Sequence, residues 1–193
     1  MRPKQPASDD GMKRATVSGI VGSIEVCWST AGIASIRFLH EAIEPDGGAA
    51  TPLLEKLKAY LFGERVDFKD EPLRLTDCTP FQRKVLEACR QIQYGETTSY
   101  AGLARLVGQP GAARAVGGVM RRNPVPIIIP CHRVLSSGGG LGGFSAPGGV
   151  SLKERLLAME QSHAISRREK KLDRQTLGTL PTPQSNRSKQ HHG

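Results

Sequence analysis

The sequence predicts an α+β protein, in which a small N-terminal β-meander with one helix precedes a mainly helical, winged helix-turn-helix unit. Short β-like runs separated by turn residues occupy residues 14–39, a pattern typical of an antiparallel meander. Apolar residues at helical spacing, interrupted by Gly and Pro, follow over residues 79–120, a pattern typical of a helix-turn-helix. The two patterns divide the 193-residue chain into two units.

Composition sets the expected domain boundaries. Residues 1–13 are polar, contain Pro and Gly, and form an expected flexible leader. Residues 14–76 form an N-terminal α/β domain, and residues 77–161 form a C-terminal domain. Residues 162–193 are rich in Ser, Gln, Lys and Arg, which predicts a disordered basic tail.

Three strands are expected in the N-terminal domain, from Ala15 to Ile20, from Ser23 to Trp28 and from Ile33 to Leu39. A helix should follow, because leucines recur at helical spacing after Thr51, which suits the capping position, and Pro52, which suits the first helical position. Residues 66–75 predict an edge strand. We recognise no catalytic pattern in this domain.

Three helices are expected at the start of the C-terminal domain, and they begin at a Thr79 cap, at a cap formed by Thr97 or Thr98, and at Ala112. The second and third helices are joined by a tight turn that contains Gly and Pro, which places the third in the recognition position of a helix-turn-helix. An apolar strand over residues 127–129 then leads to Cys131. A last helix should end near Glu160.

Cys131 is the candidate nucleophile. Pro130 fixes the backbone immediately before it, and we expect the cationic character of His132 and Arg133 to lower the pKa of the thiol from its ordinary value of about 8.5. The glycine-rich stretch of residues 136–145 lets backbone amides approach a flat ligand closely. The alternative is that Cys131 is a buried small hydrophobic residue, as most intracellular cysteines are.

Basic charge is concentrated around this cysteine. Residues 79–160 carry ten Lys and Arg against four Asp and Glu, and residues 161–193 carry seven against two, whereas residues 1–78 carry ten against twelve. A polyanionic partner such as nucleic acid and a merely solvated basic face both fit this distribution.

The same survey bears on compartment and metals. No apolar run approaches the roughly 18 residues of a membrane span, and no secretory signal precedes the first domain, so we expect a cytoplasmic protein without membrane contact. It would associate with the nucleoid, or be nuclear in a eukaryote. The four cysteines lack zinc-ligand spacing, so they should be reduced and no metal is expected.

The third predicted helix has unusually small side chains. Gly117 and Gly118 stand in its interior, where each glycine costs ~1 kcal/mol relative to alanine. We therefore expect something to approach this helix closely. Packing against another helix and insertion into the minor groove of DNA are both open, and small side chains with a single Arg114 suit the second.

Pro130-Cys131-His132-Arg133-Val134, preceded by Asn123-Pro124-Val125-Pro126, resembles the active-site motif of the O6-alkylguanine-DNA alkyltransferases, also called methylated-DNA-protein-cysteine methyltransferases. The resemblance runs from about Thr79 to Glu160. It implies direct, stoichiometric transfer of the alkyl group from O6-alkylguanine in double-stranded DNA to the cysteine. It further implies a monomer that meets DNA from the minor groove, flips the target base and needs no cofactor.

The resemblance also implies catalytic roles. Cys131 would be the nucleophile and His132 the base, acting through a water molecule. Glu160 would be the carboxylate that orients the imidazole, with Glu154 as the competing candidate. Asn123 would lock the turn that leads to the cysteine.

Other residues would hold the DNA and the flipped base. Arg114 would fill the gap left in the base stack, and Tyr100 would hydrogen-bond and protonate the purine. The backbone at Cys131 and Val134, with the loop at Ser145, would hold the guanine edges. The helix surface against the minor groove would be formed by Ala113, Ala115, Gly117, Gly118 and Arg121.

Three other classes of protein fit parts of the pattern. Relatives that only bind alkylation lesions, without enzymatic activity, carry tryptophan in place of the cysteine, and Cys131 argues against that class. A helix-turn-helix regulator whose thiol senses alkylation or oxidation is not excluded, although no effector domain is recognisable. A cysteine hydrolase would need an oxyanion hole, and Arg114 would then have no purpose.

Overall fold

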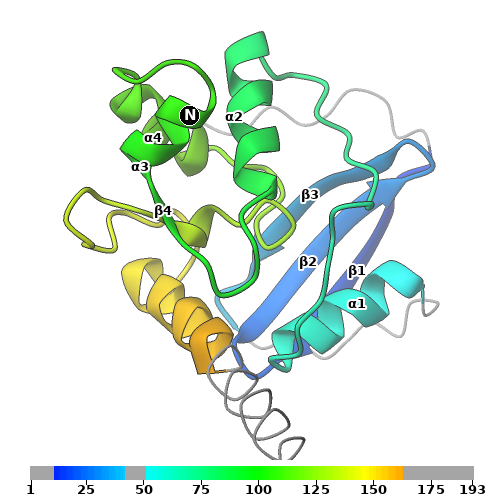
Figure 1. Ribbon diagram of the computed structural model, residues 1–193. Helices are drawn as coiled ribbons and strands as arrows, with labels where there is room; N and C mark the ends of the chain where they lie inside the picture. The colour runs from blue at the N-terminus through cyan, green and yellow to red at the C-terminus, as the bar shows by residue number, and fades with distance from the viewer. Residues whose placement is uncertain (1–10, 42–50, 163–193) are drawn as a thin grey trace, which may run out of the picture.

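The computed structural model describes residues 11–41 and 51–162, so most of the expected leader and nearly all of the expected basic tail lie outside the described residues. The described chain confirms the α+β class. A three-stranded sheet and one helix lie on one side of the molecule, and the remaining helices lie on the other (Figure 1). Within the described residues, no helix is long and apolar enough to cross a membrane.

The sheet is the predicted antiparallel meander. Its strands are β1 (Lys13–Gly19), β2 (Gly22–Ser29) and β3 (Gly32–Phe38), in the order β1-β2-β3. Alternate side chains such as Ile24 and Val26 are fully buried, as the period of two along a strand requires. The strands form because β-branched residues alternate with polar ones and short turns separate them.

Helix α1 (Pro52–Leu61) packs against β1. The Thr51 side chain accepts a hydrogen bond from the Leu54 amide at 3.3 Å, which confirms the predicted cap. Leu54, Leu57, Tyr60 and Leu61 are its buried face. The backbone of β1 approaches the end of this helix so closely that a side chain at Gly19 would collide with Leu61.

The predicted edge strand over residues 66–75 is wrong. This segment passes over the sheet as a strap with a turn at residues 69–70 (Figure 1), and within it only Leu73 forms a bridge, to Ile33. The reason lies in its hydrogen bonds: the Arg90 guanidinium binds the carbonyls of Phe68 and Glu71, which a strand would have offered to a neighbour. These bonds fasten the strap to helix α2 (Pro80–Arg90).

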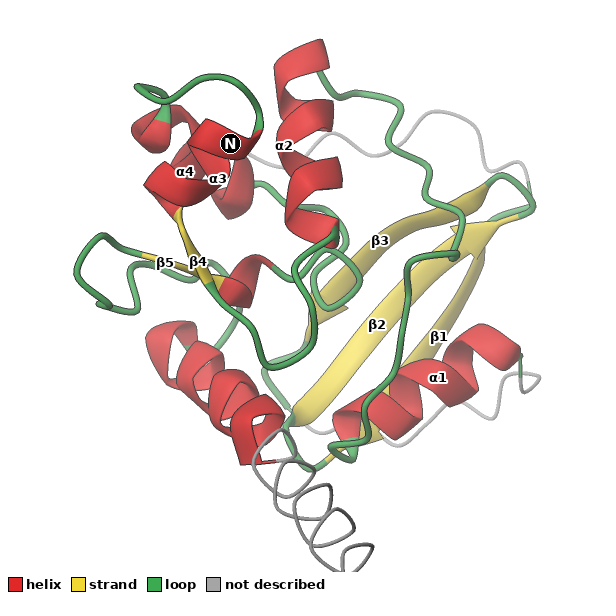
Figure 2. Ribbon diagram, viewed as in Figure 1, coloured by secondary structure: helices red, strands yellow, loops and turns green. Residues whose placement is uncertain are grey.

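Helix α2 begins with a capping box, in which Thr79 and Gln82 satisfy each other's backbone amides. Helices α3 (Tyr100–Leu106) and α4 (Ala113–Arg121) follow at the expected places (Figure 2). The cap of α3 is Ser99, however, and neither Thr97 nor Thr98. The helix begins at Tyr100, directly after strand β4 (Thr98–Ser99), so Ser99 is the residue in the capping position, and its side chain accepts from the Gly102 amide at 2.9 Å.

Residues 127–129 form a turn, and the predicted strand there is wrong. Ile127 has a φ of 76°, which is a strained conformation for a β-branched residue. The turn is closed by the Asn123 side chain, which accepts from the Val125 amide at 3.1 Å and donates to the Ile129 carbonyl at 2.7 Å. A 3-10 turn, η1 (Cys131–Arg133), and strand β5 (Val134–Leu135) follow.

Strand β5 pairs in parallel with β4, so that Thr98 lies opposite Val134 and Ser99 opposite Leu135. The pairing places the start of α3 beside the cysteine segment, although some thirty residues separate them in sequence. A last helix begins at residue 149 and continues to residue 162, the end of the described range, so it passes the expected end near Glu160.

Candidate active site

Cys131 lies at the start of η1 and is only 7% exposed. Burial raises the pKa of its thiol above the ordinary value, whereas a hydrogen bond from Asn123 and the charge of Lys153 oppose this rise. The expectation that His132 and Arg133 would lower this pKa is therefore wrong. Both side chains turn to Glu160 instead, and the resting thiol is protonated.

His132 and Glu160 meet in the protein interior, and both are fully buried. The Nε2 atom of His132 lies 2.9 Å from Oε1 of Glu160. Burial lowers the pKa of His132, so the ring is neutral. A carboxylate only accepts hydrogen bonds, so Nε2 carries the proton and Nδ1 does not. The Nδ1 atom is buried without a hydrogen-bond partner among the described residues.

Glu160 is held by five donors. Arg133 donates from Nε to Oε2 at 2.9 Å and from Nη2 to Oε1 at 2.8 Å, and the Gly95 amide donates to Oε2 at 3.1 Å. His132 and the hydroxyl of Tyr60, at 2.7 Å, reach Oε1. Burial alone would raise the pKa of this carboxyl, but its contacts with His132 and Arg133 hold it well below its usual range. Glu154, the competing carboxylate, is exposed.

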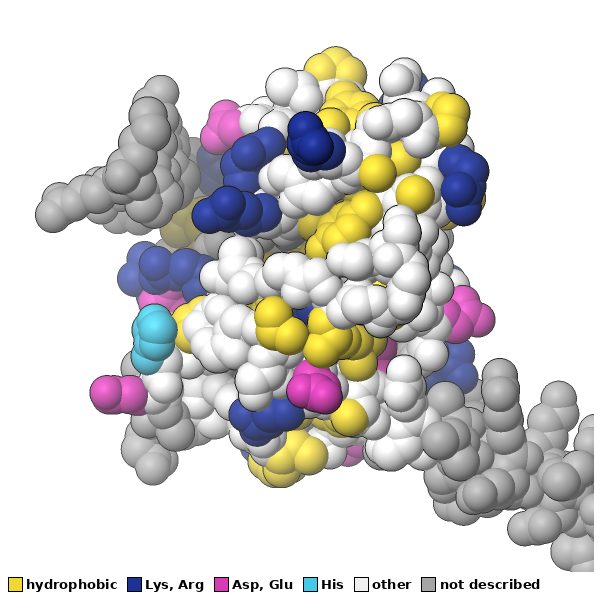
Figure 3. Space-filling view, turned by 90° about the vertical axis from the view of Figure 1, so that its left-hand side faces the viewer, with side chains coloured by type: hydrophobic (Ala, Val, Ile, Leu, Met, Phe, Trp, Pro, Cys, Tyr) yellow, Lys and Arg dark blue, Asp and Glu magenta, His cyan; other side chains and the backbone are white. Residues whose placement is uncertain are grey.

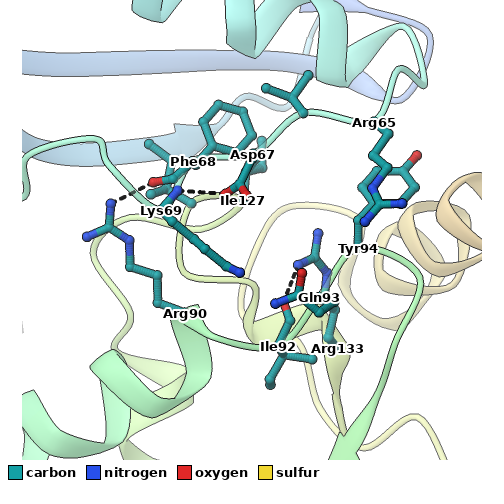
Figure 4. A pocket seen from close by; sticks show the side chains of 12 residues that line it. Arg65, Asp67, Phe68, Lys69, Arg90, Ile92, Gln93, Tyr94, Ile127 and Arg133 are labelled. Atoms are coloured by element: carbon teal, nitrogen blue, oxygen red, sulfur yellow. Dashed lines mark hydrogen bonds between the residues drawn. The ribbon is translucent and has the colours of Figure 1, made fainter.

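A pocket opens beside Arg133, between the strap and the loop after α2 (Figure 4). Arg133 Nη1 donates to the Ile92 carbonyl at 2.6 Å, and its guanidinium lies 5.7 Å from the centre of the Tyr94 ring. Cys131 does not line this pocket. The pocket therefore borders the Arg133–Glu160 pair without giving access to the thiol.

Lys153 projects from the last helix into the same interior and is fully buried. Its ammonium donates to the Val134 carbonyl at 2.6 Å and lies 5.9 Å from the centre of the Tyr100 ring. Burial lowers its pKa, and the nearby Cys131 and Cys89 oppose that shift. Lys153 is thus a buried cation next to the candidate nucleophile.

Tyr100, at the start of α3, is half-buried against the glycine-rich loop of residues 136–145. Burial raises the pKa of its phenol, so the hydroxyl keeps its proton and can donate it. Gly142 has a φ of 67°, and a Cβ there would come within 3.2 Å of the Tyr100 hydroxyl. Ser145 donates to the Arg121 carbonyl at 3.0 Å, which ties this loop to the end of α4.

Helix α4 presents its small residues to solvent. Arg114, Ala115 and Arg121 are exposed, and Ala113, Gly117 and Gly118 are partly exposed. A Cβ at Gly117 would meet only the Tyr100 ring at 3.9 Å, and one at Gly118 only the end of Arg122 at 3.6 Å. Close packing inside the described chain therefore does not require these glycines. On the face that Figure 3 shows, Lys and Arg side chains spread over the upper half with few acidic ones among them.

Comparison with known proteins agrees with this geometry. Residues 80–162 match the family model described as "6-O-methylguanine DNA methyltransferase, DNA binding domain". The methylated-DNA–protein-cysteine methyltransferase of Mycobacterium tuberculosis is 39% identical over 157 residues, which cover 77% of this chain and 92% of that protein. The chain belongs to this methyltransferase family.

Two further relatives support the assignment. The human methylated-DNA–protein-cysteine methyltransferase is 39% identical over 172 residues, which cover 79% of this chain and 82% of that protein. The crystal structure of Mycobacterium tuberculosis OGT in complex with DNA is similar with a TM-score of 0.67 and 38% identity, over 76% of this chain and 91% of that chain.

In this member of the methyltransferase family, the sequence indicated many of the residues that the structure brings together. It missed three features of the candidate site: the buried Lys153, the pairing of Arg133 with Glu160, and Tyr60. Lys153 had a usable signal, because it shares helical spacing with Leu156 and Glu160 on the buried face of the last helix. The pairing of Arg133 with Glu160 had none. Tyr60 also had none, since its spacing within α1 predicted burial without indicating a partner.

Proposed function

We propose that the protein repairs DNA by moving the alkyl group of O6-alkylguanine to the sulfur of Cys131, once per protein molecule. The new bond is S–C and the broken bond is C–O6, whose electron pair stays with the guanine. The observation that carries this proposal is the buried His132–Glu160 pair next to Cys131 in a chain of this family. The product thioether is a poor leaving group, so the protein is consumed.

The thiol loses its proton to His132. Its pKa is raised by burial, so a base is needed, and the neutral imidazole offers Nδ1 because Nε2–H faces Glu160. A water molecule relays the proton from Sγ to Nδ1. The Lys153 ammonium stabilises the thiolate as it forms, and no cofactor takes part in these steps.

The purine leaves its stack and lies between Tyr100 and the glycine-rich loop. Tyr100 donates its hydroxyl proton to the purine as negative charge develops there. The backbone of Cys131 and Val134 and the loop at Ser145 hold the guanine edges. Asn123 keeps the turn before the cysteine closed, so the thiol faces the base.

Helices α3 and α4 act as a helix-turn-helix, with the short β4–β5 sheet as the wing, and α4 enters the minor groove. Its small residues allow the sugar-phosphate walls to approach closely, and Arg114 fills the space of the flipped nucleotide. The C-terminal domain, residues 77–161, carries the reaction and the N-terminal domain, residues 14–76, supports it. The protein acts as a monomer in the compartment that holds the DNA.

Intact mass spectrometry tests this function. The protein is incubated with a short duplex that contains one O6-methylguanine, and Cys131→Ala serves as the control. We expect wild type to gain one methyl group and never more, and the variant to gain none. Tight binding of the lesion without any gain in mass would contradict the proposal and indicate a protein that binds lesions without repairing them.

A further inference from the structure

Tyr60 joins the N-terminal domain to the candidate catalytic pair. It lies in the last turn of α1 and is fully buried. Its hydroxyl is 2.7 Å from Oε1 of Glu160 and 3.2 Å from Nε2 of His132, residues that lie 100 and 72 positions further along the chain. The contact is therefore a long-range link made through one oxygen atom.

The direction of these hydrogen bonds follows from counting protons. Burial and the neighbouring Glu160 raise the pKa of Tyr60 well above its ordinary value, so the phenol is protonated. Its single proton goes to the carboxylate, which can only accept. The Tyr60 oxygen then turns a lone pair to His132, so Nε2 faces two acceptors. Both require the proton on Nε2, and Nδ1 is left as the basic nitrogen.

The position of the hydroxyl is itself fixed. The Tyr60 ring packs edge-to-face against Phe68, with ring centres 6.0 Å apart, and against Tyr94, at 6.1 Å. Phe68 belongs to the strap and Tyr94 to the loop after α2. Helix α1, the strap and the loop after α2 thus hold the Tyr60 ring in place, and such support is what a side chain needs in order to orient its neighbours precisely.

We infer that Tyr60 is a positioning residue for alkyl transfer, which fixes the tautomer and orientation of His132 through the shared contact with Glu160. This inference rests on the proposed function. It makes the rate of transfer depend on helix α1 of the N-terminal domain, which contributes no residue to the DNA surface described above.

Tyr60→Phe removes only the hydroxyl, and Tyr94→Phe is the matched control. Tyr94 belongs to the same ring cluster, but its hydroxyl donates to the Gly63 carbonyl at 3.1 Å. Single-turnover kinetics at saturating methylated duplex separates the rate constant from the amplitude, which is the fraction of competent protein. We expect Tyr60→Phe to lower the rate constant about tenfold, as the loss of a hydrogen bond to a charged group implies, with the amplitude retained. Tyr94→Phe should react at the wild-type rate.

A second comparison tests the route of the effect. In a His132→Gln background, Tyr60→Phe should cause no further slowing, because the residue through which it acts is gone. The affinity of Cys131→Ala for the duplex should not change when Tyr60→Phe is added. Equal rates for wild type and Tyr60→Phe, or a fall in amplitude alone, would overturn the inference. If wild type itself transfers no methyl group, the proposed function fails instead.

Discussion

The side chains of Arg133 and Glu160 form a two-point ion pair in the protein interior, with Nε 2.9 Å from Oε2 and Nη2 2.8 Å from Oε1. Geometry of this kind suits guanidinium and carboxylate better than any other pair of side chains. The same carboxylate also binds His132. The Arg133–Glu160 pair therefore stabilises the fold and also forms part of the candidate site.

Loss of the guanidinium should destabilise the protein strongly. Arg133→Leu leaves the Glu160 carboxylate buried without its counter-charge, and we expect a loss of about 3–5 kcal/mol in the free energy of unfolding. Urea denaturation measures this quantity. The control is Arg37→Leu, which breaks the pair with Glu25 at a side chain that is 64% exposed and should cost below about 1 kcal/mol. Similar losses in both variants would contradict the importance of the buried pair.

Lys153 should control the acidity of the thiol. Its charge lowers the pKa of Cys131. Lys153→Met should therefore raise that pKa and slow the reaction of the thiol with an electrophile at neutral pH. Alkylation of Cys131 by iodoacetamide over a pH series, followed on its own peptide by mass spectrometry because Cys27 and Cys78 are also partly exposed thiols, reports the midpoint, which we expect to move upward. Lys58→Met, in α1, serves as the control. An unchanged midpoint in Lys153→Met would show that the ammonium does not act on the sulfur.

The stability of the protein should fall on acidification in two stages. Burial lowers the pKa of His132, and Glu160 is held below its usual range by His132 and Arg133, so at both positions the unfolded chain binds more protons than the folded one. The contribution of His132 is complete above its unfolded pKa of about 6.5 and is lost as the pH falls below it, by up to about 1.4 kcal/mol per pH unit. The contribution of Glu160 is lost below about pH 4.3.

Urea titrations at a series of pH values from about 7.5 to about 3.5 would measure this dependence, because this range spans the pKa values of His and Glu in an unfolded chain. His132→Gln should have a shallower slope than wild type below about pH 6.5. The exposed His40 provides the control substitution, His40→Gln. If both histidine variants kept the wild-type slope, the burial of a neutral His132 would not be the cause.

Gly118→Ala should separate folding from DNA binding. The position has ordinary space for a methyl group beside Arg122, and alanine favours a helix interior by ~1 kcal/mol over glycine, so the free protein should become slightly more stable. The same methyl group should weaken binding to duplex DNA if α4 lies in the minor groove. Fluorescence anisotropy measures the affinity, with Ser35→Ala on β3 as the control. Wild-type affinity together with raised stability would argue that this surface of α4 does not touch DNA.

Much of the fold followed from local sequence, because local rules decide it. Thr51 and Thr79 cap the helices that were expected to follow them, and the meander needs only alternation and short turns. Residues 127–129 were mispredicted for the opposite reason. Three consecutive isoleucines favour a strand, but the Asn123 side chain closes a turn around them.

The candidate site divides in the same way. Cys131 and His132 could be found because they are adjacent in a motif, whereas Glu160 followed only from a family resemblance. Tyr60 lies 72 residues before His132, and no local pattern links a helix residue to a partner at that distance. The predicted lowering of the Cys131 pKa was wrong because His132 and Arg133, which adjoin Cys131 in sequence, direct their side chains to Glu160.

The ladder between β4 and β5 ties the main chain that precedes Tyr100 to the main chain that follows Cys131, through the pairs Thr98–Val134 and Ser99–Leu135. On the proposed mechanism, the distance between the base beside Tyr100 and the sulfur of Cys131 is therefore set by backbone pairing, which point substitutions alter little. Anyone redesigning the protein to accept a bulkier alkyl label should leave this ladder intact. Substitutions should instead be made at Gly140 and Gly143, where a new side chain would meet almost nothing.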